Sequence, residues 1–433
     1  MPPGTMRRRR GLSAVDDVAL LCAFGRDVMT RSYDTGSARV GYRRPGLAIA
    51  MAGLFMAVFG LRASAEWSRI HQVPTGRYAG LATLVGDPES RGAGVSVVFR
   101  IEGWRYEAVL YGADAVRVRD HMQGESVLLA ANRRAWSESA SRYKLVRHIA
   151  GRLDDIVLGG DWTEGSALSR ATNRLRRLIA HGASALPAAE GSLLVGLVIG
   201  DDRAQPRAMR TAFREAGLSH LTAVSGQNIA FVLAVFAPFV TRLRTRGRLL
   251  ATLGIVGAFT LMTRAEPSVL RAAAMAGLAA IVFACGGKIG AGTTLVASSA
   301  LLLLADPFLA WSVGFWLSFS ATAGLVVLSS RIVGILENHR CPRIVAVPLA
   351  ASVAAQLATA PVLVLVFGAP SPWGIVANLL AVPVAGAVML CGLPLCLAAG
   401  FVGGSVAAVL TAPLLLGVRY VWWVAAVVAQ LPG

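Results

Sequence analysis

The second half of the chain is a succession of apolar segments separated by short polar connections. Several of these segments approach the roughly 17–25 residues that an α-helix needs to cross a bilayer. Only 15% of the residues are charged, against about 25% in typical soluble domains. These features predict a polytopic α-helical membrane protein. The expected spans are Leu218–Val240, Leu249–Met262, Pro267–Ala284, Thr293–Leu304, Pro307–Leu328, Ile344–Phe367, Trp373–Ala399 and Val402–Val428, the last with a re-entrant or interfacial piece around Arg419 as one option.

An earlier apolar segment, Gly46–Leu61, lies near the amino terminus and follows a cluster of arginines. Basic residues accumulate on the cytoplasmic side of spanning helices. We therefore expect a basic cytoplasmic tail over residues 1–45 and a first transmembrane helix over residues 46–63.

Between this segment and the later spans, the chain is polar and shows an alternating pattern. Val95, Val97, Phe99 and Ile101 alternate with residues that are mostly polar, which is the period of a half-buried strand. Several short strands separated by Gly and Asp turns indicate a small β-barrel, for which the OB-fold is one option. Further strands are expected at Tyr78–Val85, Trp104–Tyr111 and Ser126–Ala131.

These patterns predict a small extracytoplasmic β (OB-like) domain near the N-terminus, over residues 64–135. Residues 136–200 are expected to form an amphipathic, interfacial helical connection, because Arg170, Arg174 and Arg177 share one helical face.

The chain is strongly basic, with 42 Lys+Arg against 24 Asp+Glu. Arginines beside apolar spans act as a topology signal, and arginines also pair with nucleic-acid phosphates. If the polar segment is outside, the connections at Arg242–Arg248, Lys288 and Arg331–Arg343 fall inside, and those at Glu266, Asp306 and Ser371 fall outside. We therefore expect a cytoplasmic N-terminus and extracytoplasmic residues 64–200.

Histidine and cysteine patterns predict neither a metal site nor a cofactor. The five cysteines form no CxxC pair, and the six histidines form no HxH or HxxxH pair. Metal sites need several such ligands at close spacing.

Polar residues are dense around residues 217–228, inside the first of the later spans. If this segment is helical, His220 and Gln227 are nearly aligned, with Ser225 and Asn228 on a broader polar arc. Two explanations remain open: a polar lining for a channel or substrate path, and hydrogen bonding between helices. A nucleophilic Ser225 is a weaker hypothesis, because Ala-Val-Ser-Gly differs from the GxSxG elbow.

A second polar group is formed by Arg264, Glu266 and Arg271. Arg271 lies one turn inside an apolar span and should need a partner, for which Glu266 and Asp306 are the candidates. Either a structural ion pair or a substrate contact would explain it. Gln356 and Asn378 are further polar exceptions, whereas Gly314, Ser318 and Thr322 form a small-residue stripe that suits close helix packing.

Taken together, these residues resemble the ComEC family of bacterial competence channel proteins. The resemblance implies an inner-membrane pore that admits single-stranded DNA during natural transformation, with no enzymatic activity in this chain. It makes residues 201–433 a competence-type transmembrane channel domain, lined by the polar residues above. The matching blocks, in the family's order, are Gly196–Arg203, Phe213–Asn228, Glu266–Ala272, Asp306–Gly324, Ala360–Pro361, Phe367–Ser371 and Ala377–Pro383.

The resemblance also implies partners and a DNA-binding surface. The expected partners are single-stranded DNA, the lipid bilayer, a DNA receptor, and a cytoplasmic translocation ATPase or helicase. A separate nuclease and a second copy of the chain are open additions. An OB-like domain binds single strands with basic and stacking aromatic residues, for which the candidates are Trp104, Arg105, Tyr106, Arg117 and Arg119.

The sequence departs from the longest family members in one respect. Those members continue into a metallo-β-lactamase-like domain, whereas no HxHxDH-type cluster occurs here, so we expect no nuclease activity. The alternatives are a secondary transporter or flippase for another anionic substrate and, third, a membrane hydrolase using Ser225 and His220.

Overall fold

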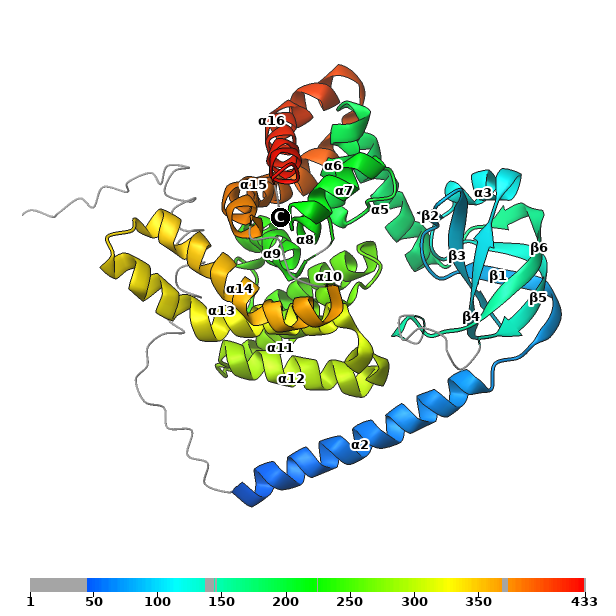
Figure 1. The fold of residues 1–433 in the computed structure, drawn as a ribbon, viewed down its shortest axis with the longest axis horizontal. Helices are drawn as coiled ribbons and strands as arrows, with labels where there is room; N and C mark the ends of the chain where they lie inside the picture. The colour runs from blue at the N-terminus through cyan, green and yellow to red at the C-terminus, as the bar shows by residue number, and fades with distance from the viewer. Residues whose placement is uncertain (1–44, 137–143, 145, 224, 368–372, 432–433) are drawn as a thin grey trace, which may run out of the picture. The chain divides into compact units, whose positions relative to one another are not determined.

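The computed structural model describes residues 45–136, 144, 146–223, 225–367 and 373–431 (Figure 1). Residues 54–433 belong to one compact unit. The predicted basic tail lies outside the described residues, except for its last residue. Helix α2 (Pro45–His71) covers the predicted first span and continues past it. It is not among the helices that qualify as membrane spans by length and composition, so its membrane crossing stays a prediction.

A mixed sheet follows α2, as the alternation predicts. The strand order is β1-β5-β6-β4-β3-β2, and β1 also pairs with β3, so the pairing closes into a ring of five strands. Neighbours are antiparallel except for β4 and β6, which run parallel. The strands are β1 (Gly76–Leu84), β2 (Glu89–Arg91), β3 (Gly94–Ile101), β4 (Trp104–Leu110), β5 (Ser126–Ala135) and β6 (Ile149–Thr163), with helix α3 (Gly112–Arg119) between β4 and β5.

The core of this sheet domain lies inside the ring. Val95, Val97, Phe99 and Ile101 are all buried while Arg100 is exposed, which confirms the predicted strand and its inward face. Strand β6 continues the sheet to Thr163. The expected domain boundary at residue 135 therefore falls inside the sheet, and the helical connection begins later.

Helices make up the rest of the described chain (Figure 1). Five of those described are long and apolar enough to cross a membrane: α11, α13, α14, α15 and α16. The chain therefore fits a multi-pass membrane protein. The helices are α5 (Ala167–Ala183), α6 (Ala188–Ile199), α7 (Arg207–Glu215), α8 (Ser219–Thr222), α9 (Gly226–Val240), α10 (Thr245–Met262), α11 (Pro267–Ala284), α12 (Ala291–Ala305), α13 (Val313–Asn338), α14 (Arg343–Phe367), α15 (Gly374–Val402) and α16 (Gly404–Val428).

Two predicted spans are wrong in their boundaries. The expected continuous helix Leu218–Val240 is broken, because α8 ends at Thr222, Ala223 is extended, and α9 starts only at Gly226. The expected span Pro307–Leu328 begins with a short 3-10 helix, Pro307–Trp311. Ser312 then starts α13 by accepting a hydrogen bond from the Phe315 N–H, as N-cap residues do.

The carboxyl-terminal helices form two hairpins, α13 with α14 and α15 with α16. Helix α16 is continuous through Arg419, so no re-entrant piece interrupts it. Arg419 instead pairs with Glu190 of α6 at 2.9 Å. Helix α15 also packs on α5 at very short range, since a side chain on Gly182 would collide with the Cys396 carbonyl. Small residues allow such close approach of helices.

Candidate functional site

The break between α8 and α9 is held by a buried asparagine. Asn228 is 3% exposed, and its Nδ2 donates to the Leu197 carbonyl, near the end of α6, at 3.2 Å. Ser225 Oγ donates to Asn228 Oδ1 at 3.1 Å. A carbonyl at a helix end otherwise has no intrahelical partner, so Asn228 fixes the start of α9 against the end of α6.

Two other polar residues of this segment, His220 and Gln227, do not join the contact between Asn228 and α6. His220 lies in α8 and Gln227 in the first turn of α9, and both are exposed. The predicted alignment of His220 with Gln227 is wrong, because the chain is not one helix between them. The hydrogen bond of the Ser225 hydroxyl goes to Asn228, and His220 Nδ1 lies 3.2 Å from the Gly217 carbonyl. Among the described residues, the Ser225 hydroxyl makes no hydrogen bond to a histidine or a carboxylate.

Arg271 is buried inside α11, at 5% exposure. Its guanidinium donates to Ser318 Oγ and, at 2.7 Å, to Thr322 Oγ1, both on α13. The expected ion pair with Glu266 or Asp306 is wrong, since no carboxylate lies within ion-pair distance of Arg271 in the described part of the chain. The predicted stripe of small residues on α13 thus supplies the hydroxyl partners of Arg271.

The two predicted acidic partners have other environments. Glu266 is exposed and stands at the N-cap of α11 without a side-chain capping bond. Asp306 accepts from the Phe308 N–H at 3.0 Å and contacts His148 Nε2 at 3.0 Å.

The two polar exceptions of the later helices lie apart from Arg271 in the sequence and on other helices. Gln356 is half-buried on α14. Asn378 is half-buried on α15, and its Oδ1 is a buried atom with no hydrogen-bond partner in the described structure. Such an unsatisfied amide oxygen is uncommon in folded proteins.

Arg264 belongs to a charged cluster that the sequence did not reveal. Its Nη2 and Nε contact the two oxygens of Asp87 at 2.6 and 3.0 Å, and Nη2 also donates to Asn173 Oδ1 at 2.9 Å. Arg264 has a φ of 61°, a conformation that costs energy for a non-glycine residue. The fork onto Asp87, which lies in the loop after β1, offsets that cost.

The cluster continues through α5 and the loop after α6. Arg176 contacts Asp87 at 3.1 Å and Asp201 at 2.7 Å, and Arg203 pairs with Asp201 at 2.7 Å. Burial alone would raise the pKa of Asp201, but hydrogen bonds from Arg203 and the charge of Arg176 lower that pKa to about 2. Burial likewise opposes ionisation of Asp87, yet Arg176 and Arg264 hold its pKa below the usual value. These paired charges stay ionised at neutral pH.

The sequence motif Gly86-Asp87-Pro88 signals only a turn, and nothing in it indicates arginine partners. We name the set Asp87, Arg176, Asp201, Arg203 and Arg264 the charge cluster.

The predicted DNA-binding residues of the sheet domain divide by strand face. Tyr106 lies opposite Phe99 inside the ring, has no exposed surface, and donates through its hydroxyl to the Pro74 carbonyl at 2.8 Å. Its ring therefore offers no face for stacking, and its expected role is corrected on that ground. Trp104 is half-buried, with the Arg69 guanidinium 5.6 Å above its ring.

Arg105 points to the outer face of β4, directly opposite Arg100 of β3. Its Nη1 donates to the Arg147 carbonyl at 2.9 Å. Burial and the charge of Arg100 lower the pKa of Arg105, and Asp306 partly offsets them. Like charges directly opposite each other destabilise a strand pair, so this arginine pair favours an anion on the outer face.

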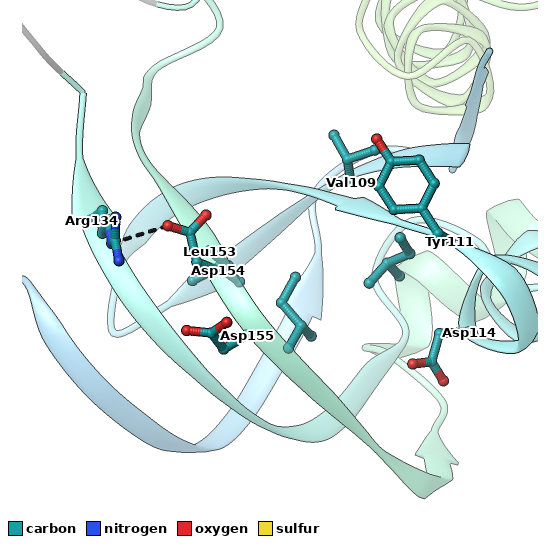
Figure 2. A pocket seen from close by; sticks show the side chains of 9 residues that line it. Val109, Tyr111, Asp114, Arg134, Leu153, Asp154 and Asp155 are labelled. Atoms are coloured by element: carbon teal, nitrogen blue, oxygen red, sulfur yellow. Dashed lines mark ion pairs between the residues drawn. The ribbon is translucent and has the colours of Figure 1, made fainter. Parts of the chain in front are cut away.

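The two candidate arginines of α3 lie on another side of the domain. Arg117 donates to the Gly159 carbonyl at 3.1 Å and pairs with Asp114 at 3.4 Å, whereas Arg119 is exposed. Beside them is an open hollow of about 480 Å³ (Figure 2). Its charged lining residues are Asp114, Asp154, Asp155 and Arg134. Tyr111 and apolar residues complete the lining. Its acidic lining does not suit a polyanion.

Metal chemistry finds no support in the described residues, where no group of three or more His, Cys, Asp or Glu side chains could hold an ion.

Comparisons with known proteins match the helical part of the chain. The family model described as Competence protein matches residues 197–433, more than half of the chain. ComE operon protein 3 of Bacillus subtilis (strain 168) is 28% identical over 211 residues, which cover 48% of this chain and 26% of that protein. Competence protein ComA of Neisseria gonorrhoeae is 31% identical over 217 residues, covering 47% of this chain and 30% of that protein.

The chain thus matches less than a third of the length of each relative. No solved structure matches. The family match runs from the end of α6 to the end of the chain, and so includes the broken α8–α9 segment, Arg271 and all five candidate spans. The chain belongs to the Competence protein family.

Proposed function

We propose that this chain is the conduit through which single-stranded DNA crosses the bacterial inner membrane during natural transformation. The observation that carries the proposal is the extent of the family match, which covers the apolar helices together with the polar break and the buried arginine. A polyanion needs polar and cationic groups along its path, because bare hydrocarbon would leave its charges unsolvated. Asn228 and Arg271 are the buried polar groups of α9 and α11 that meet this need.

The orientation of the chain follows the distribution of its basic residues. With a cytoplasmic N-terminus, residues 64–200 are extracytoplasmic, and the basic connections after α9 and after α13 fall in the cytoplasm. In this orientation the sheet domain meets incoming DNA before the helices do.

The sheet domain is proposed to be an OB-fold that receives the strand. A ring of five strands in a Greek-key arrangement is the architecture of that fold, whose second and third strands carry the usual binding face. The corresponding strands here are β3 and β4, whose outer face carries Arg100 and Arg105. Replacing both by Ser should reduce DNA retained at the cell surface, whereas Arg134→Ser, beside the acidic hollow, should not.

The chain is proposed to transport rather than to catalyse. In the part of the chain that the structure describes, Ser225 has a hydrogen bond to Asn228 and none to a base, which supports this. Ser225→Ala should leave DNA uptake within twofold of the wild type. A loss as large as that of a gene deletion would favour the hydrolase hypothesis instead.

The proposed partners are a DNA receptor outside, a translocation ATPase or helicase inside, a separate nuclease, and a second copy of the chain. A secondary transporter or flippase for another anionic substrate would share the broken α8–α9 segment, because interrupted helices line substrate sites in such proteins. The choice between DNA and another anion rests on what the cell fails to import without the chain.

The test is transformation in a naturally competent host that carries this gene. Deleting the gene should abolish transformation by a marked DNA fragment, and expression of the full chain in trans should restore it. Normal transformation without the gene would refute the DNA proposal, and loss of another imported anion in that strain would point to the transporter alternative.

A further inference from the structure

The guanidinium of Arg271 is a buried cation whose charge is unmatched. It is 5% exposed, and in the described structure its partners are the Ser318 and Thr322 hydroxyls and, at 3.7 Å, Met275 Sδ. None of these groups carries a negative charge. Burying an unpaired charge is among the costliest arrangements in a protein, and more so within an apolar span.

Two other arginines of the described chain show what is missing. Arg176, which is buried, contacts two aspartates, and Arg419 of α16, whose side chain is exposed, pairs with Glu190. Among these three arginines, Arg271 is the one with neutral partners alone. The hydroxyls hold its side chain in one orientation without neutralising it.

The start of α9 lies beside Arg271. A side chain on Gly226, the first residue of α9, would contact the Ala272 methyl at 2.9 Å and would lie 3.8 Å from Arg271 Nη2. Ser225 makes no side-chain capping bond to α9. The Asn228 N–H donates to the Ser225 carbonyl, so the N–H groups at the start of α9 that lack an intrahelical partner are those of Gly226 and Gln227. The amino end of a helix carries partial positive charge and binds anions. Two positive groups therefore meet here, and no carboxylate of the described residues forms an ion pair with Arg271.

Gly226 lets α9 approach α11 closely at this place, since a side chain on it would collide with Ala272. The hydroxyl of Ser225 and the second N–H of Arg271 Nη2 both lie close to the start of α9. An arginine fork with adjacent backbone N–H groups is the usual receptor for a phosphate group.

We propose that Arg271 and the amino end of α9 bind a phosphodiester group of the nucleic acid strand inside the membrane. Ser318 and Thr322 are positioning residues that aim the guanidinium toward α9. The inference rests on the proposed function, because it takes the transported strand as the source of the phosphodiester. In the arrangement described here Arg271 is covered, so binding of a strand requires α9 to separate from α11.

The test is equilibrium binding of a fluorescent single-stranded oligonucleotide to the purified full chain in a phospholipid-free detergent, measured across a range of salt concentrations. Each phosphate contact contributes about 0.7 to the slope of log K against log salt for a single strand. Arg271→Gln should make the slope shallower by about 0.7 and weaken binding about tenfold at low salt. Arg271→Lys should keep the slope but lose part of the affinity, because lysine keeps the charge without the fork.

Two controls separate phosphate binding from a structural role. The double variant Glu190→Gln with Arg419→Gln removes the paired span arginine, and it should keep the wild-type slope. A methylphosphonate oligonucleotide, which has an uncharged backbone, should bind equally to the wild type and to Arg271→Gln.

The remaining outcomes of the binding experiment distinguish the alternatives. An unchanged slope in a folded Arg271→Gln protein would overturn the inference and leave the DNA conduit standing. A different result would be an unchanged slope in Arg271→Gln together with less phospholipid phosphate bound to this variant than to the wild type after membrane extraction. That result would overturn the inference and identify a lipid headgroup as the ligand. If Arg271→Gln does not fold, the Arg271→Lys protein is the test. Lysine keeps the positive charge, so a salt slope shallower by about 0.7 in Arg271→Lys than in the wild type would contradict a charge-based contact. Absence of oligonucleotide binding by the wild-type chain would count against the proposed function itself.

Discussion

Arg264 and Asp87 are 177 residues apart in the sequence, yet the guanidinium of Arg264 forks onto both carboxylate oxygens of Asp87, at 2.6 and 3.0 Å. The fork joins the loop after β1 to the connection between α10 and α11. Arg176 on α5 contacts the same carboxylate, so one aspartate of the sheet domain holds two helical elements. A buried network of this kind is sensitive to the loss of any single member.

Asp87→Asn should destabilise the protein strongly. The change leaves the buried Arg176 guanidinium with Asp201 as its one remaining carboxylate partner, and breaking a buried pair from one side costs about 3–5 kcal/mol. The measurement is thermal unfolding in detergent, followed by the circular dichroism of the helices. Arg264→Lys keeps the charge but not the fork, and its Tm should fall by less than that of Asp87→Asn. Equal Tm values for Asp87→Asn and the wild type would contradict the role of the charge cluster.

The charge cluster also predicts how stability depends on pH. Arginine contacts lower the pKa of Asp87 and bring that of Asp201 to about 2, both below the ordinary 3.8. A carboxyl whose pKa is lower in the folded state adds stability above its unfolded pKa and loses it as the pH falls toward the folded value. Tm should therefore be insensitive to these two groups above about pH 5 and should fall below pH 4. In Asp87→Asn the acid-induced fall should be smaller, and an equally steep fall would argue against this origin.

Asn228→Ala should weaken the junction between α6 and α9. It removes the donor to the Leu197 carbonyl, and leaving a buried polar group unsatisfied costs about 1–3 kcal/mol. Gln227→Ala changes the exposed neighbouring residue and should alter stability by less than about 0.5 kcal/mol. Both are measured as Tm shifts. A larger shift for Gln227→Ala would mean that the exposed side of the break is the important one.

Two glycines of α13 offer a matched test of helix packing. A side chain on Gly324 would meet the Ala354 carbonyl at 2.5 Å, whereas nothing lies within 4 Å of one on Gly334. Gly324→Ala should therefore cost about 1–3 kcal/mol by forcing α13 away from α14. Gly334→Ala should be neutral or stabilising by up to about 1 kcal/mol, since alanine favours the helix. Equal Tm shifts for the two variants would contradict the close approach of the hairpin.

The sequence predicted the helices and strands whose limits are set by neighbouring residues. Helix α11 begins at Pro267 and ends at Ala284 as expected, because proline suits a first turn and the apolar run has clear ends. Strand β3 follows the alternation of its apolar residues. The break after Thr222 was missed, because the polar residues around it were interpreted as one face of a continuous helix.

The site was less predictable because its partners are distant in the sequence. Arg271 was expected to pair with an acid in a nearby loop, yet its partners Ser318 and Thr322 are 47 and 51 residues away on α13. Nothing in the local sequence distinguishes hydroxyls that pack from hydroxyls that hold an arginine. Similarly, the composition of β4 suggested an aromatic binding face, but the pleat turns Tyr106 into the core and Arg105 outward.

The central claim is that this chain carries DNA across the membrane, and DNase protection tests it most directly. Competent cells that lack the gene are given labelled DNA, treated with DNase, and fractionated to separate the cytoplasm from the cell envelope. The account predicts that label still binds the envelope but that no protected single strands reach the cytoplasm, and that the full chain supplied in trans restores them. Protected cytoplasmic strands at the wild-type level without the gene would contradict it.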